Sequence, residues 1–103
     1  MFRRSRFHEL IERQLALFVE DNAALIVDVE EADRAQREAP ADEAEARYEA
    51  YADLVETGTE ILAELRDTFA ATLDDEAREA YEREFNRAVV KRLPRFGLEI
   101  DSL

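Results

Sequence analysis

Residues 44–72 read AEARYEAYADLVETGTEILAELRDTFAAT, and this stretch decides the fold. Its apolar and small residues recur at alternating steps of four and three, with charged residues between them. This period places one apolar stripe along one side of an α-helix. The stripe consists of Ala44, Tyr48, Tyr51, Val55, Gly58, Leu62, Leu65, Phe69 and Thr72.

The stripe predicts a helix over residues 41–72. Pro40 suits the first turn of this helix, because its missing amide hydrogen would have no helical partner there. Gly58 leaves an alternative open, since Thr57 and Glu60 have the spacing of a capping box that would start a new helix. The stripe keeps its phase across Gly58. We therefore expect a continuous helix in which Gly58 marks a close helix contact.

A second periodic segment lies before Pro40 and predicts a helix over residues 5–37. Its apolar seam runs from Ile11 to Ala32, and further apolar residues flank the seam on both sides. The apolar arc therefore covers about half of the helix circumference, which is more than one neighbouring helix can cover. We expect self-association through this helix. The predicted interface consists of Leu10, Leu17, Val19, Asn22 and Ile26.

Asn22 is the polar member of this seam. A polar residue among packed apolar positions commonly fixes the register or the number of associating helices, at some cost in stability. The alternative is that Asn22 faces a solvent-filled gap.

Residues 75–93 form the third predicted helix. Asp74 is a suitable N-cap, the first turn is acidic and the last turns are basic, as the helix dipole favours. Pro94 and Gly97 end this helix. Three helices with short connections predict an all-α, antiparallel three-helix bundle in a single domain, residues 1–103, with flexible tails at 1–4 and 95–103.

The composition agrees with a helical domain and offers little chemistry. The chain is 47% hydrophobic and has only two Gly and two Pro, which disfavours disorder and β-sandwiches. It has no Cys and a single His, His8, so thiol catalysis and a Ser/His/Asp triad cannot be built from its few candidate residues. His8 and Glu12 lie one helical turn apart and are best interpreted as a solvated pair. We expect a protein that is not an enzyme and has no metal site and no cofactor.

The net charge of −12 is unevenly distributed. Residues 15–84 carry six basic and twenty-two acidic side chains, whereas both ends are basic. Basic residues interleaved with apolar ones can contact anionic lipids or nucleic-acid phosphates. Alternatively, basic residues near the end of a helix only stabilise it through a favourable interaction with the helix dipole. The basic end clusters are Arg3, Arg4 and Arg6 at the start, and Lys91, Arg92 and Arg95 near the end.

These observations favour a helical protein–protein interaction module that packs in a coiled-coil-like manner, forms a homodimer and binds a protein partner. The alternative is a regulatory or scaffolding module whose basic ends contact nucleic acid or an anionic membrane. No uncharged apolar run is long enough for an export signal or a membrane span, so we expect a cytoplasmic protein.

Overall fold

The computed structural model describes residues 6–103, and all regular structure in this part of the chain is helical. The all-α prediction is confirmed, but the prediction of a three-helix bundle is wrong, because residues 6–103 form four α-helices and two short 3-10 helices. The elements are α1 (His8–Asp21), α2 (Ala23–Arg37), α3 (Ala44–Ala70), α4 (Asp75–Arg92), η1 (Pro94–Phe96) and η2 (Ile100–Ser102).

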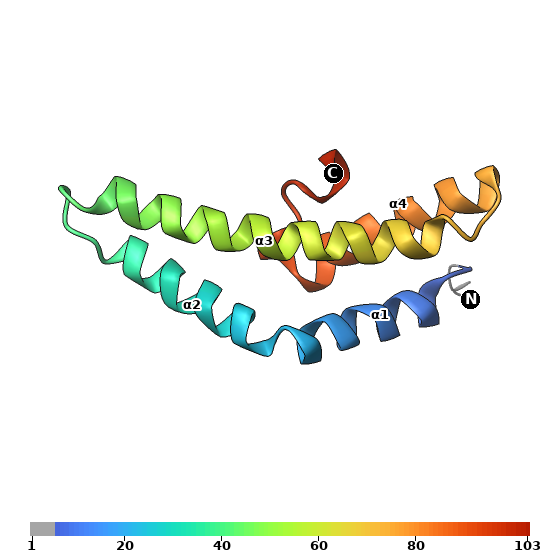
Figure 1. The fold of residues 1–103 in the computed structure, drawn as a ribbon, viewed down its shortest axis with the longest axis horizontal. Helices are drawn as coiled ribbons and strands as arrows, with labels where there is room; N and C mark the ends of the chain where they lie inside the picture. Colours follow the sequence, from blue (N-terminus) through green and yellow to red (C-terminus); the bar gives the residue numbers. More distant parts are fainter. Residues whose placement is uncertain (1–5) are drawn as a thin grey trace.

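The predicted first helix is divided at Asn22 into α1 and α2, and the chain bends there (Figure 1). The side-chain amide of Asn22 donates a hydrogen bond to the carbonyl oxygen of Phe18 at 3.0 Å, and the backbone N–H of Asn22 donates to the same oxygen. Such local side-chain bonding competes with regular helix geometry and bends helices. The expectation that Asn22 lies within one continuous helix is therefore corrected: Asn22 is the point at which that helix ends.

The prediction that the helix continues through Gly58 is confirmed, because α3 runs unbroken from Ala44 to Ala70. The close contact at Gly58 is made with the ring of Phe96 in η1. A Cβ atom added at Gly58 would overlap this ring and would lie 2.9 Å from its Cδ1 atom. The helix begins three residues later than predicted because Pro40 and Glu43 form a turn, closed by a 2.9 Å backbone hydrogen bond.

The predicted start of α4 is confirmed, since Asp74 caps the helix by accepting a hydrogen bond from the backbone N–H of Ala77 at 2.9 Å. Beyond α4 the sequence predicts a flexible tail from residue 95. In the structure this C-terminal segment, residues 93–103, folds back against α3, and Phe96 and Ile100 are buried.

The molecule is elongated, with extents of 50 × 27 × 24 Å. Its radius of gyration is 15.7 Å, whereas a compact domain of this length would have about 13 Å. Two regions account for this shape. The body comprises residues 6–22 and 58–103, where α1, α4 and the second half of α3 pack together. The arm comprises residues 23–57, where α2 pairs with the first half of α3 (Figure 1).

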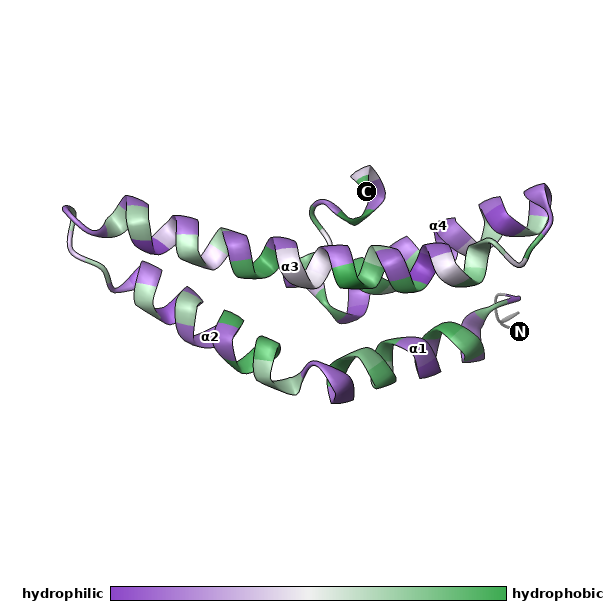
Figure 2. Cartoon of the chain, viewed as in Figure 1, coloured by the Kyte–Doolittle hydropathy of each residue, from purple (hydrophilic) through white to green (hydrophobic). Residues whose placement is uncertain are grey.

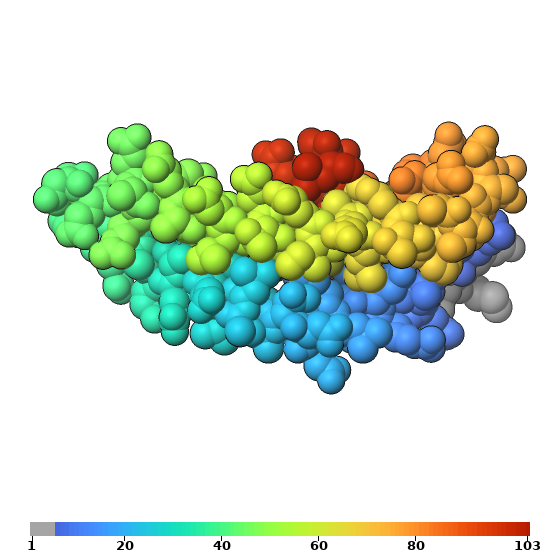
Figure 3. Space-filling view, viewed as in Figure 1, coloured from blue at the N-terminus to red at the C-terminus, as the bar shows by residue number. Residues whose placement is uncertain are grey.

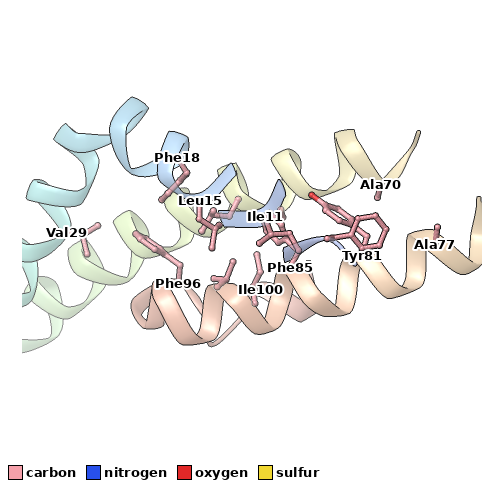
Figure 4. Packing of buried hydrophobic residues seen from close by; sticks show 14 residues of the cluster. Ile11, Leu15, Phe18, Val29, Ala70, Ala77, Tyr81, Phe85, Phe96 and Ile100 are labelled. Carbon is pink, nitrogen blue, oxygen red and sulfur yellow. The ribbon is translucent and has the colours of Figure 1, made fainter. Parts of the chain in front are cut away.

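The hydrophobic core lies almost wholly in the body. The side chains of Tyr81, Phe85 and Leu62 are fully buried there. The ring of Tyr81 contacts the rings of Phe7, Phe69 and Phe85 in edge-on or tilted arrangements. Figure 4 shows Tyr81 and Phe85 side by side in this core. In the arm, Val29 is the only buried residue, and residues 41–50 are all exposed. In Figure 2 hydrophobic residues lie along α1, in the part of α2 next to the bend and along the middle and second half of α3, whereas the outer end of the arm is mostly pale or hydrophilic.

Candidate interaction surfaces

The five predicted interface residues of α1 and α2 have different environments. Leu10 and Ile26 pack partly buried against the core of their own chain, and Asn22 forms the bend. Leu17 and Val19 stay exposed, at 49% and 41%. Two of the five side chains therefore offer apolar surface to another molecule.

Leu17 and Val19 do not form one surface, however. They are two residues apart in a regular helix, so their side chains point about 200° apart around its axis. A single partner helix can contact one of them but not both.

The basic end clusters are also divided. Arg3 and Arg4 lie outside the described residues, and the guanidinium of Arg6 lies 5.2 Å from the ring centroid of Phe7. Arg92 forms an ion pair with Glu12 of α1 at 2.5 Å. Lys91 is exposed and takes part in none of the ion pairs formed among residues 6–103.

Arg95 connects the body to the arm. Its guanidinium donates a hydrogen bond to the carboxylate of Asp33 in α2 at 2.9 Å. The hydrogen bonds from Gln36 and Arg95 hold the pKa of Asp33 below its ordinary value, and the hydrogen bond to Asp33 raises the pKa of Arg95. The pair is therefore charged and fixes η1 against α2.

Arg66 is buried, with 4% of its surface exposed, and it anchors the C-terminal segment. Its guanidinium donates hydrogen bonds to the side chain of Asn86 at 2.9 Å and to the main-chain oxygens of Ile100 and Leu103 at 2.8 and 2.5 Å. Its Nε atom also pairs with Asp67. A buried charge needs such a full set of partners, so Arg66 is a structural anchor.

Gln14 and Tyr81 form a second buried polar contact, in which the Tyr81 hydroxyl donates to Oε1 of Gln14 at 2.9 Å. Burial raises the pKa of the Tyr81 hydroxyl from 10.0 to about 12, against the opposing effect of this hydrogen bond. The phenol is neutral at physiological pH and links α1 to α4.

A groove of about 440 Å³ lies between the first half of α3 and the C-terminal segment. Tyr48, Tyr51 and Val55 of α3 line one wall, and Arg95 and Leu98 line the other. Leu98 is 87% exposed and Tyr48 is 57% exposed. In Figure 3 the C-terminal segment (red) stands out from α3, and a hollow separates it from the first turns of that helix.

Sequence reasoning missed Arg66, Gln14 and the groove. The positions of Arg66 and Gln14 carried a signal: Arg66 follows Leu62 by four residues, and Gln14 follows Ile11 by three, so both lie on apolar helix faces. No sequence pattern predicted the groove, because its second wall is formed by the C-terminal segment and depends on where that segment packs.

The described residues lack two other kinds of site. Residues 6–103 contain no group of three or more His, Asp or Glu side chains placed to hold a metal ion. No helix in the same range has both the length and the apolar character needed to cross a membrane.

Comparisons with protein-family models, curated proteins and solved structures found no match to this chain.

Proposed function

We propose that this chain is a non-enzymatic helical interaction module that self-associates through helix packing. The observation that carries the proposal is the arm, where two helices pair without a third. A helical pair gains most of its stability from burying its apolar faces, and Val29 is the only residue that the arm buries. A helix from a partner molecule could pack against this pair and bury its apolar side chains.

The exposed apolar side chains support this proposal. Tyr48 of the arm is 57% exposed, and it lines the groove together with Leu98, which is 87% exposed. Single exposed apolar residues are common on soluble proteins, but adjacent ones around a groove are typical of interaction sites.

The alternative, a module whose basic ends contact nucleic acid or an anionic membrane, receives less support. Arg92 and Arg95 are already paired with Glu12 and Asp33, so their charges are largely neutralised within the chain. The net charge of −12 would also repel phosphates from most of the surface.

Sedimentation velocity tests the proposal. We expect the mass to rise with concentration from the 11.9 kDa of one chain towards twice that value. Association by helix packing should weaken only modestly as salt is raised, because apolar contacts do not depend on salt, whereas charge-driven binding to nucleic acid or an anionic membrane would weaken steeply. A strict monomer at about 50 µM would overturn the proposal, since a stable interface should be populated at that concentration.

The predicted contact on α1 is tested with Leu17→Ser and Val19→Ser as separate variants. If α1 contributes to association, one of the two should weaken it and the other should serve as its control, because the two side chains point in different directions. Equal masses for both variants and the wild type would remove α1 from the interface.

A further inference from the structure

One face of α3 is covered along half of its length only. In the body this face is buried at Thr59, Ala63, Arg66 and Ala70, beneath α4 and the C-terminal segment. The same face continues into the arm through Tyr48, Ala52 and Val55, at the same steps of three and four. There it forms the wall of the open groove. The arm thus presents a helix face without the third helix that covers it in the body.

The flank of α3 beside this face is strongly acidic. Seven exposed carboxylates recur at steps of four and three, which places them on one side of the helix. Asp67 is the one member that forms an ion pair among those found in residues 6–103, and its partner is Arg66. We call this series the acidic stripe. It consists of Glu45, Glu49, Asp53, Glu56, Glu60, Glu64 and Asp67.

Like charges four residues apart destabilise a helix in isolation. The acidic stripe is therefore an unfavourable arrangement within one chain, and a basic partner alongside α3 would relieve it. An occupant of the groove must accordingly have apolar side chains flanked by positive charge.

The chain itself carries such a surface on the outer side of α4. Arg83, Arg87 and Lys91 follow one another at steps of four, and all three are exposed. Val90, between the last two, is 54% exposed. None of these three basic side chains joins an ion pair in the described part of the chain. We call these four residues the basic ridge.

We propose that the groove is the docking site for α4 of a second copy of this chain, with the basic ridge facing the acidic stripe. The proposal rests on the self-association proposed above and names its contact surfaces. Val90 supplies an apolar side chain for the groove, and Arg87 and Lys91 oppose Glu49 and Glu56.

The dimensions are compatible. At 1.5 Å per residue, the ridge from Arg83 to Lys91 is about 12 Å long, and the groove wall from Tyr48 to Thr59 is about 17 Å long. Charge of opposite sign on the two surfaces would speed association and select the register.

A charge exchange tests the proposal. Variant A carries Arg87→Glu and Lys91→Glu, and variant B carries Glu49→Lys and Glu56→Lys. Each variant alone would place like charges against each other, so we expect its self-association to weaken by about tenfold or more. Mixing A with B restores opposite charges at the contact, and the mixture should associate about as tightly as the wild type.

A matched control separates local from overall charge effects. Arg13→Glu with Arg34→Glu changes the net charge as much as variant A does, at two exposed positions away from both surfaces. It should associate like the wild type, and circular dichroism should show that all variants keep the wild-type helix content.

The outcomes distinguish the two proposals. A wild-type protein that associates while A and B associate equally well would overturn the docking proposal alone. A wild type that stays monomeric would overturn self-association and docking together. Binding of a monomeric wild type, but not of variant A, to phosphatidylserine vesicles would assign the ridge to a membrane and also overturn the proposal.

Discussion

The body and the arm share the helix α3 but enclose it differently. In the body, α3 packs against α4 and the C-terminal segment in a core that also includes side chains of α1, and Leu62 is fully buried. In the arm α2 is the one helix that pairs with it, the C-terminal segment lies across the open groove, and Tyr48 is more than half exposed. A regular apolar stripe therefore indicates where a helix can be buried, but its neighbours determine how far it is buried.

The body and the arm should differ most in the free energy of unfolding that is lost when a core side chain is removed. Phe85 has no exposed surface, and Phe85→Ala should lower the free energy of unfolding by about 3–5 kcal/mol, through lost burial and the cavity that remains. Urea denaturation followed by circular dichroism measures this loss. The size-matched comparison is Leu62→Ala in the body, where the side chain is fully buried, with Leu54→Ala in the arm, where it is only partly buried. An equal loss for the two variants would contradict the distinction between body and arm.

The buried phenol of Tyr81 gives the body a dependence on alkaline pH. The folded protein has a pKa of about 12 for this hydroxyl, and an ordinary tyrosine in the unfolded chain has 10.0. Below pH 10 the group is neutral in both states and has no effect. Between these two pKa values the unfolded chain loses its proton first, so stability falls as pH rises, by up to about 3 kcal/mol.

Denaturation of the wild type and of Tyr81→Phe across this pH range isolates the effect. The variant should lose this part of the pH dependence, although it also leaves Gln14 without its partner. Parallel curves for the two proteins between pH 9 and about 12 would mean that the hydroxyl is not protected by burial.

Gly58 lies where the body meets the arm, and Gly58→Ala tests that junction. Alanine is intrinsically better than glycine in a helix by about 1 kcal/mol, but its methyl group would overlap the buried ring of Phe96. We expect a net loss of about 1–2 kcal/mol, because displacing a packed ring costs more than the helix gains.

Combining Gly58→Ala with Phe96→Ala tests whether overlap with the ring of Phe96 causes the loss. In a Phe96→Ala background the overlap is gone, and Gly58→Ala should then stabilise the protein. A stabilising effect in the wild-type background as well would show that the ring of Phe96 moves aside at little cost.

The sequence was sufficient for the helices whose burial follows a regular period. The stripe along residues 44–72 predicted α3 through Gly58, and its members Gly58 and Leu62 are buried. These positions depend on local periodicity, which the amino-acid order records directly.

The bend at Asn22 and the folded C-terminal segment could not be predicted in the same way. Asn22 lies on the apolar seam at regular spacing, so the period continues across a point where the helix does not. The position of Ile100 depends on Arg66, thirty-four residues earlier in the chain, and such pairing leaves no periodic signal. The groove follows from that fold-back and was therefore missed as well.

Tyr48→Ala should have the smallest effect on the stability of a single chain. The side chain is 57% exposed, and substitutions at such positions usually change stability by less than about 0.5 kcal/mol. The same side chain lines the groove, so the variant should associate more weakly than the wild type in sedimentation. Denaturation in dilute solution and sedimentation at high concentration therefore measure different properties of one residue. A loss above about 1 kcal/mol in dilute solution would show that Tyr48 supports its own chain, since a side chain awaiting a partner contributes little to the isolated protein.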